Sequence, residues 1–337
     1  MKRAVEMAHA RPGLSEMLHV EWHLGNRCNY ACSYCPPYLR DGSVPWLERD
    51  AVFDFCNRLR AHSQSLGRSL SYKFSGGEPT LYPHFIDMLA LLKGQGCLTS
   101  AISNATAGVK WWTKAREHLD SVQLTHHIES VDIDHFMAVA RLLSAKIRTH
   151  VNVTMHVGRF DDCLANARRI EAECPGVSVT LKPLLVGFGS ELYPYAPAQL
   201  ETLQTAHFAK PKERPVSFTR GPLRIVYDDG SEEIKWASRL VVEDATRFAG
   251  WTCDAGLEYL VIKFTGDIYR ANCKEGGLIG NIADPHVTLP SEAIVCRKKL
   301  CHCLADVNTS RKRPVLAGNH SEAKPDARTS ARRLPVA

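Results

Sequence analysis

Residues 28–35 read Cys-Asn-Tyr-Ala-Cys-Ser-Tyr-Cys and directly follow a predicted strand at residues 19–24. Cys28, Cys32 and Cys35 therefore share one loop with the spacing C-x3-C-x2-C. Three thiolates this close can bind three corners of an iron–sulfur cubane. A structural zinc site and a [4Fe-4S] cluster both normally take four protein ligands. The missing fourth ligand leaves one metal position open for a small molecule; the alternative is half of a zinc site completed elsewhere in the chain.

Predicted strands and helices alternate through the first half of the chain. Strands are expected at residues 19–24, 71–75, 98–103, 121–125, 148–156 and 177–185, and helices at residues 48–65, 85–92, 111–119, 134–143 and 161–174. This alternation indicates an α/β fold of parallel βαβ units whose helices cover the sheet. Six such units can form a doubly wound sheet or a partial barrel. In both, loops at the C-terminal ends of strands carry the chemistry.

The pattern changes after about residue 190. We expect an N-terminal arm at 1–17, the α/β unit at 18–190, a linker and β-hairpin at 191–250, a small hairpin-rich cysteine unit at 251–306 and a basic disordered tail at 307–337. The two predicted hairpins turn at residues 228–230 and 265–266, which read Asp-Asp-Gly and Thr-Gly and are typical of turns.

Composition excludes several classes of protein. The 337 residues are 45% hydrophobic and 23% charged, which is the balance of a soluble globular protein. No apolar run approaches the ~20 residues that span a bilayer, and the start lacks the apolar region of a secretory signal, so we expect a cytoplasmic protein without a membrane partner. The net charge is +6, and residues 307–337 hold seven Lys or Arg against two Asp or Glu, so the body is not expected to bind nucleic acid. Twelve cysteines without a secretion signal favour metal ligation or catalysis over disulfides.

The cysteine loop resembles the signature loop of the radical S-adenosylmethionine (SAM) superfamily. The resemblance implies that Cys28, Cys32 and Cys35 ligate a [4Fe-4S] cluster, that SAM chelates its fourth iron and that Tyr34 lies near the adenine. It also implies a partial (β/α)6 barrel similar to a TIM barrel.

Two turns add to this resemblance. Residues 75–79 follow the second strand and are similar to the family's GGEP motif, whose glycines let the backbone approach SAM and whose Glu or carbonyls accept from its ammonium group. Residues 103–106 follow the third strand and resemble the family's ribose-contacting turn, with Ala105 in place of the usual glycine. The implied SAM contacts are Gly76, Gly77, Glu78, Pro79, Ser103 and Asn104.

Later strand ends carry less specific signals. Residues 125–129 read Thr-His-His-Ile-Glu where relatives often carry a Ser-Leu-Asp turn. Adjacent strand residues point to opposite faces, so at most one of His126 and His127 faces the cavity, and a wall histidine is the alternative interpretation. Asn152 on the fifth strand and Lys182 on the sixth are predicted to contact SAM or substrate.

A second cysteine group lies around the C-terminal hairpin. It resembles the auxiliary iron–sulfur extension called SPASM, or its shorter form called twitch. Counting ligands favours one auxiliary [4Fe-4S] cluster, held by Cys253, Cys273, Cys301 and Cys303, with Cys296 as the alternate. A structural zinc knuckle is the alternative, and either metal would staple so small a unit.

The resemblance implies reductive cleavage of SAM to a 5′-deoxyadenosyl radical that abstracts hydrogen from a substrate. The implied partners are an external one-electron reductant of the flavodoxin or ferredoxin type and a peptide, protein side chain or small molecule as substrate. Because only ~18 residues precede the first predicted strand, a peptide substrate would need a separate leader-binding protein. An RNA-modifying enzyme of the same superfamily and a non-catalytic zinc-binding interaction protein are the alternatives. No individual catalytic residue is predicted.

Overall fold

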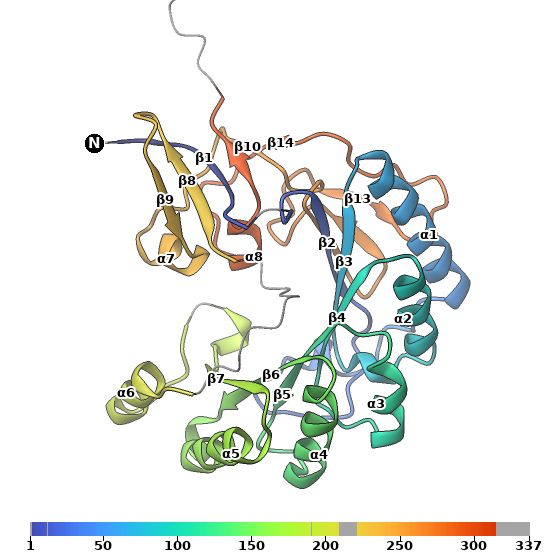
Figure 1. Ribbon diagram of the computed structural model, residues 1–337, viewed down its shortest axis with the longest axis vertical. Helices are drawn as coiled ribbons and strands as arrows, with labels where there is room; N and C mark the ends of the chain where they lie inside the picture. Colours follow the sequence, from blue (N-terminus) through green and yellow to red (C-terminus); the bar gives the residue numbers. More distant parts are fainter. Residues whose placement is uncertain (1, 12, 190, 209–220, 315–337) are drawn as a thin grey trace, which may run out of the picture.

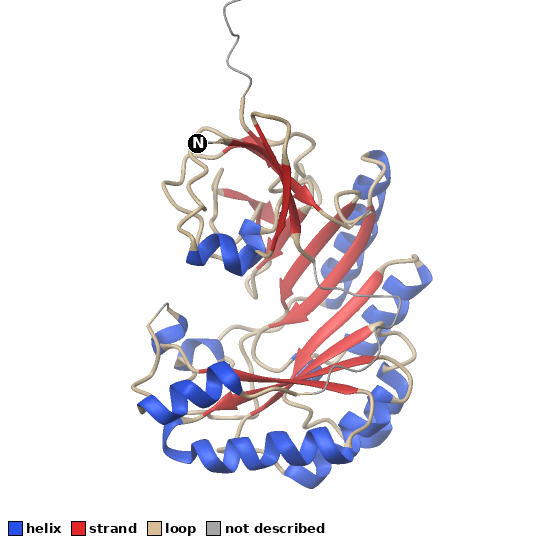
Figure 2. Ribbon diagram, turned by 60° about the vertical axis from the view of Figure 1, so that its left-hand side comes forward, coloured by secondary structure: helices blue, strands red, loops and turns tan. Residues whose placement is uncertain are grey.

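The computed structural model describes residues 2–11, 13–189, 191–208 and 221–314. Two β-sheets dominate these parts of the chain: a large curved sheet with helices on its convex face, and a smaller sheet beside the concave face (Figures 1 and 2). The predicted tail beyond residue 314 and residues 209–220 of the predicted linker lie outside the described residues.

Six parallel strands form the centre of the large sheet, and their spatial order follows the chain. They are β2 (Met17–His23), β3 (Ser69–Ser75), β4 (Leu98–Ser103), β5 (Ser121–His126), β6 (Arg148–Met155) and β7 (Val177–Pro183). The helices between them are α1 (Arg49–Ser65), α2 (Phe85–Gly94), α3 (Val109–Ala115), α4 (Ile133–Ser144) and α5 (Phe160–Glu173). Short 3-10 helices lie at Pro37–Leu39, Pro79–Leu81, Val157–Arg159 and Val186–Phe188. The predicted alternation is confirmed, with small shifts of the element ends.

Side chains of the parallel strands alternate between the helices and the concave face. Trp22, Tyr72 and Phe74 point to the helices and are fully buried. Phe55 of α1 meets Trp22 edge-to-face, and Phe85 of α2 meets Phe74 in the same way. Burying these aromatic rings fixes the helices on the convex face, which leaves the concave face free for a ligand.

The large sheet stays open at both edges. Strand β7 is one edge; beyond β2, the sheet continues with parallel β11 (Tyr259–Ile262) and antiparallel β12 (Asp267–Tyr269) and β13 (Leu278–Asn281). Among the described residues no strand joins β13 to β7, so the expected partial barrel is confirmed. The second predicted hairpin is present as β11 and β12, but it extends the barrel sheet, whereas the sequence placed it in a separate cysteine unit.

The smaller sheet corrects two expectations. Its order is β14-β10-β15-β1-β8-β9. The strands are β1 (Ala4–His9), β8 (Leu223–Tyr227), β9 (Glu232–Lys235), β10 (Thr252–Cys253), β14 (Ile294–Val295) and β15 (Arg311–Lys312). Residues 4–9, expected in an arm, form an interior strand, and residues 311–312, expected in a disordered tail, pair with that strand and with β10. The first predicted hairpin is present as β8 and β9.

Buried polar contacts hold the N-terminal strand in place. His9 Nε2 lies 3.5 Å from Glu258 Oε2, and both side chains are buried. Ser310 N donates to the same carboxylate oxygen at 2.8 Å. These partners are far apart in sequence, so local composition did not indicate that the segment is ordered.

Further helices are α6 (Pro197–Thr205), α7 (Ala237–Val242) and α8 (Leu304–Val307). Within the described residues, no helix combines the length and apolarity that crossing a bilayer requires.

Candidate functional site

The three cysteines of residues 28–35 lie on the loop that leaves the C-terminal end of β2. Cys32 is buried, Cys28 and Cys35 are half-buried, and all three are free thiols. Burial raises the pKa of Cys32 to about 11 and also raises the pKa of Cys28 and Cys35. Cys28 N donates to the Arg40 carbonyl at 3.2 Å, and Arg40 Nε donates to the Cys35 carbonyl at 3.1 Å. Arg40 therefore braces both ends of the loop.

The donor set of this loop fits an iron–sulfur cluster. The described residues contain no group of three His, Cys, Asp or Glu side chains that could hold a single metal ion. A four-iron cluster is larger than an ion and holds its thiolates at separate corners, so its ligands need not converge on one point. Three thiols on one loop are the soft ligands that such a cluster takes.

Two glycines hold the cysteine loop against the end of β3. A Cβ on Gly76 would lie 2.4 Å from the Gly25 carbonyl oxygen, and one on Gly77 would lie 2.1 Å from the Arg27 carbonyl oxygen. Gly77 N donates to Gly25 O at 2.8 Å, and Glu78 N donates to Arg27 O at 2.8 Å. The glycines therefore permit a close approach to the backbone of the cysteine loop itself, where the sequence suggested an approach to SAM.

Glu78 links two turns and is buried. Its carboxylate accepts hydrogen bonds from Ser103 Oγ at 2.8 Å, Asn104 N at 2.8 Å and Thr80 N at 3.1 Å. The side chain is 1% exposed, and burial raises its pKa against the effect of these bonds. The structure thus gives Glu78 a structural role at the junction of the two turns, and its predicted contact with an ammonium group stays a prediction; Ser103 and Pro79 are buried with it.

Asn104 lies beside the cysteine loop. Its Nδ2 donates to Asn29 Oδ1 at 2.9 Å and lies 3.9 Å from Cys28 Sγ. The next residue, Ala105, has φ of 65°, the left-handed conformation that explains why relatives place glycine there. A cavity of 280 Å³ opens here, and its lining includes Tyr30, Asn104 and Ala105.

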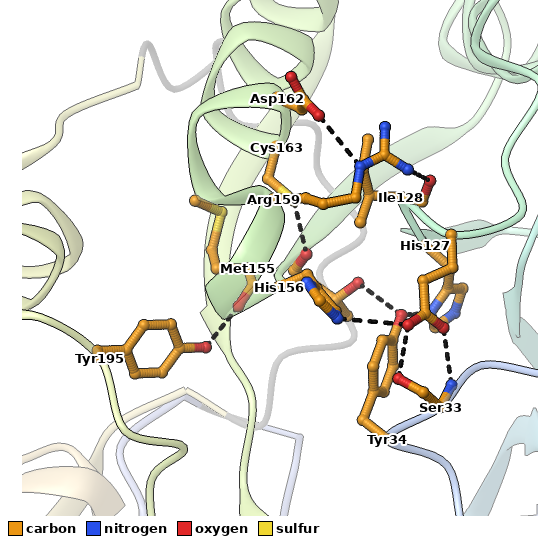
Figure 3. A network of polar contacts seen from close by, with 12 residues as sticks. Ser33, Tyr34, His127, Ile128, Met155, His156, Arg159, Asp162, Cys163 and Tyr195 are labelled. Carbon is orange, nitrogen blue, oxygen red and sulfur yellow. Dashed lines mark hydrogen bonds and ion pairs between the residues drawn. The ribbon is translucent and has the colours of Figure 1, made fainter.

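A chain of polar contacts joins the cysteine loop to the ends of β5 and β6 (Figure 3). Tyr34 Oη lies 2.8 Å from His127 Nδ1 and 3.2 Å from Thr154 Oγ1. Thr154 Oγ1 in turn donates to the His126 carbonyl at 2.6 Å. The Tyr34 and His127 rings are stacked, with centroids 5.9 Å apart.

These contacts favour one tautomer of His127. Thr154 uses its hydroxyl proton on a carbonyl, so it accepts from Tyr34. When Tyr34 donates to Thr154, it accepts from His127 Nδ1–H; the Cys32 sulfur is a second hydrogen-bond partner of the same hydroxyl. Burial lowers the pKa of His127 to about 4, so the ring is neutral near pH 7. His127 therefore presents an unprotonated Nε2.

His126 does not face the cysteine loop and is the wall histidine that the sequence allowed as an alternative. It is fully buried, meets Phe136 of α4 edge-to-face and contacts Asn166 of α5 through Nε2 at 3.1 Å. It is a wall histidine, and only His127 is on the face of the cysteine loop.

Glu129 contacts the cysteine loop, and the sequence did not indicate this contact. Ser33 donates to its carboxylate through N at 2.7 Å and Oγ at 2.5 Å, and His156 Nε2 lies 3.3 Å away (Figure 3). Burial acts to raise the pKa of Glu129, but the bonds from Ser33 and the charge of His156 prevail and lower it. The carboxylate thus holds the loop between Cys32 and Cys35.

A larger cavity of 510 Å³ lies between the concave face and the smaller sheet. Its ionisable lining residues are His19, Glu21, Lys73, Arg148, His150 and Tyr259. Burial acts to raise the pKa of Glu21, but hydrogen bonding with His23 and Tyr259 and the charge of Lys73 lower it to about 2. The cavity therefore has a polar, charged wall on the barrel side.

The two remaining predicted contacts lie on the concave face. Asn152 is buried, with its Oδ1 3.0 Å from His150 Nε2. Lys182 is exposed and is the register partner of Thr154, so it points to the same face as the Tyr34 contact. Asn152 thus lies beside His150 of the cavity lining, and Lys182 lies on the same face as the contact between Tyr34 and Thr154.

The second cysteine group assembles from separate segments. Cys253, Cys296 and Cys301 are buried, Cys273 and Cys303 are half-buried, and all are free thiols. Burial raises the pKa of Cys273 to about 11, with smaller contributions from Asp306, Cys253 and Cys296. Burial likewise raises the pKa of Cys301 to about 12, and Cys273 contributes. Cys253 and Cys273 pack in one small apolar cluster, and Cys296 and Cys301 pack in another. Cys303 Sγ accepts from Asn272 Nδ2 at 3.7 Å.

Two buried charges flank this group, and the sequence indicated neither. Asp306 accepts from Asn272 N at 3.0 Å and Cys273 N at 2.7 Å. Arg311 is 2% exposed and is the register partner of Cys253 across β10 and β15. An arginine in a basic, Pro-containing terminal stretch gave no signal of burial.

Comparisons with known proteins agree with the resemblance of the cysteine loop to the radical SAM superfamily. Residues 22–180 match the sequence profile of the Radical SAM superfamily. An S-adenosylmethionine-dependent nucleotide dehydratase of Thermoplasmatales archaeon (strain ISO4-H5) is 29% identical over 111 residues, which are 33% of this chain and 37% of that protein. The chain thus spans only about a third of that relative.

Among solved structures, native anSMEcpe with bound AdoMet is 16% identical and has a TM-score of 0.48, covering 79% of this chain and 78% of that one. SuiB of Streptococcus suis bound to S-adenosylmethionine is 16% identical and has a TM-score of 0.45, covering 77% and 61%.

Proposed function

The chain carries a radical SAM superfamily domain at residues 22–180, and from this premise we propose that Cys28, Cys32 and Cys35 hold a [4Fe-4S] cluster to which SAM binds. The observation that carries the proposal is the three-thiol loop at the end of β2, with the glycine turn packed against it. When bound, the cluster and SAM supply one chemistry, reductive cleavage to methionine and a 5′-deoxyadenosyl radical that takes hydrogen from the substrate. An external reductant of the flavodoxin or ferredoxin type supplies the electron.

The chain's own residues bind and orient SAM around that loop. Asn104 offers its amide beside Cys28, and Lys182 offers a cation for a carboxylate. His127 offers Nε2 as an acceptor for a ligand hydroxyl or ammonium. The Tyr34 ring stacks on the His127 ring and offers a flat apolar surface to the same ligand. Rigid groups of this kind hold reacting atoms close together and exclude stray hydrogen donors.

We propose a small polar molecule as the substrate, bound on the concave face between the cysteine loop and the 510 Å³ cavity, whose barrel-side lining comes from the N-terminal and middle parts of the strands β2 to β6. That volume suits a ligand of nucleotide size, and Glu21, Lys73 and Arg148 provide a charged wall for it. The similarity to a nucleotide dehydratase supports a nucleotide-like substrate over a peptide.

We further propose one auxiliary [4Fe-4S] cluster in the second cysteine group. Cys253, Cys273 and Cys301 are its ligands. Cys303 is the fourth ligand, with Cys296 as the alternate, since both lie in the same unit as free thiols.

Iron and acid-labile sulfide per chain after anaerobic reconstitution, with 5′-deoxyadenosine formed from SAM and dithionite, test both proposals. Wild type should bind about eight irons, as two four-iron clusters require. Cys28→Ala should lose about half of the iron and all 5′-deoxyadenosine. Cys253→Ala should lose the other half, and Cys56→Ala, a buried cysteine of α1, is the matched control. SAM cleavage by Cys28→Ala would contradict the first proposal, and full iron in Cys253→Ala would contradict the second.

A further inference from the structure

Arg311 of β15 is a buried cation. Its side chain donates to backbone carbonyls: Nε to Thr309 O at 3.0 Å, and Nη2 to Asp306 O at 2.5 Å, Thr309 O at 2.9 Å and Val307 O at 3.3 Å. Although burial has the larger effect and raises the pKa of the Cys301 thiol, the positive charge of Arg311 and a hydrogen bond with it act to lower that pKa. No ion pair joins Arg311 to an acidic side chain within the part of the chain that the structure describes. The guanidinium also lies 3.9 Å from the centroid of the Phe248 ring.

A charge so placed needs an anion nearby, because burying an unpaired charge is costly. The Asp306 carboxylate accepts from the backbone N–H groups of Asn272 and Cys273, and no ion pair joins it to Arg311 among the described residues. Strand β15 sets Arg311 directly opposite Cys253 of β10. Opposed residues of antiparallel strands point to the same face, so the guanidinium and this sulfur share one side of the sheet.

Cysteines that ligate metal do so as thiolates, and a cluster with four of them carries net negative charge. We propose that Arg311 is the buried counter-charge of the second cysteine group and stabilises the thiolates of Cys253 and Cys301 when they hold the auxiliary cluster. This inference rests on the auxiliary cluster of the proposed function. Arg311 touches no substrate, so it is a positioning residue that acts through the cluster's electrostatics.

The guanidinium also caps carbonyls in the last turn of α8, and substitutions separate the two roles. Arg311→Lys keeps the charge and loses the fork of donors. Arg311→Met keeps the length and loses the charge. A purely structural role makes the two variants alike, whereas a counter-charge makes them differ in the reduction equilibrium of the cluster.

The test uses the full chain carrying Cys28→Ala, Cys32→Ala and Cys35→Ala, so that iron reports the second site alone. Redox titration followed by electron paramagnetic resonance gives its midpoint potential. Adding Arg311→Met should disfavour reduction at least tenfold, which is about 59 mV for one electron. Arg311→Lys should change the reduction equilibrium of the cluster by no more than about twofold. Arg313→Met is the control, because Arg313 lies over Trp251 and donates to Ala4 O in the same strand region.

Equal potentials for the parent and Arg311→Met, or equal shifts in the Lys and Met variants, overturn the role of Arg311. If Arg311→Met does not fold, Arg311→Gln, which keeps donors for the carbonyls but no charge, carries the same measurement. Absence of iron from the triple-alanine background overturns the auxiliary cluster and this inference together. The SAM-binding cluster is judged separately, by 5′-deoxyadenosine formation in the wild type.

Discussion

Replacing Glu78 tests whether this residue supports the fold or binds SAM. Glu78→Ala removes the acceptor for Ser103 Oγ and Asn104 N, which are only 2% and 5% exposed as residues, so water cannot replace it. Each buried donor left unpaired costs about 1–3 kcal/mol, and the lost side chain leaves a cavity as well. We expect the free energy of unfolding to fall by about 4 kcal/mol. The third partner, Thr80, is half-buried and can turn to water.

Glu78→Gln is the matched variant, since an amide keeps one oxygen for Asn104 N and offers an N–H to the Ser103 hydroxyl. It should lose only about 1–2 kcal/mol. Urea unfolding gives the stabilities by linear extrapolation, and equilibrium dialysis gives the affinity for SAM. Because Glu78 is 1% exposed, Glu78→Gln should bind SAM within about threefold of wild type. A tenfold loss of SAM affinity at unchanged stability, or a stable Glu78→Ala, would refute the structural role.

Three further predictions follow from single contacts. Gly77→Ala would place a Cβ 2.1 Å from a carbonyl of the cysteine loop, so it should lower iron content by at least half after reconstitution, whereas Gly108→Ala, with open space around it, should not. His126 has its pKa lowered by burial to about 4, below its ordinary value near 6.5; the folded chain therefore binds this proton less readily than the unfolded chain. Its contribution to stability is complete above pH 6.5 and falls by about 3 kcal/mol toward pH 4; urea unfolding should show this slope, and His126→Leu should flatten it. Nitrogen-15 NMR of the imidazoles should show the proton of His127 on Nδ1, with the fixed tautomer lost in Tyr34→Phe; a proton on Nε2 in the wild type would contradict the assigned contacts.

The local pattern of the chain determined the barrel and its cysteine loop. Strands alternate apolar and polar side chains with a period of two, and helices repeat every 3.6 residues, so the βαβ order is readable without long-range information. Cys28, Cys32 and Cys35 lie within eight residues, so their joint placement is a matter of spacing. The glycines at 76 and 77 also marked the correct turn, although their close contact is with the cysteine loop.

Only the tertiary structure decided which distant residues share a site. Strand β1 and Arg311 looked like a loose arm and tail because β1 pairs with β8 and β15, and Arg311 pairs with Met7 and Cys253, and no local period encodes such pairing. Glu78 was predicted to meet SAM, but its burial between two strand ends depends on how β3 and β4 align. The tautomer of His127 likewise follows from Tyr34 and Thr154, which the barrel brings together from different strand ends. Spacing thus determines which groups are available, while burial and hydrogen-bond partners, which arise only on folding, determine what each can do.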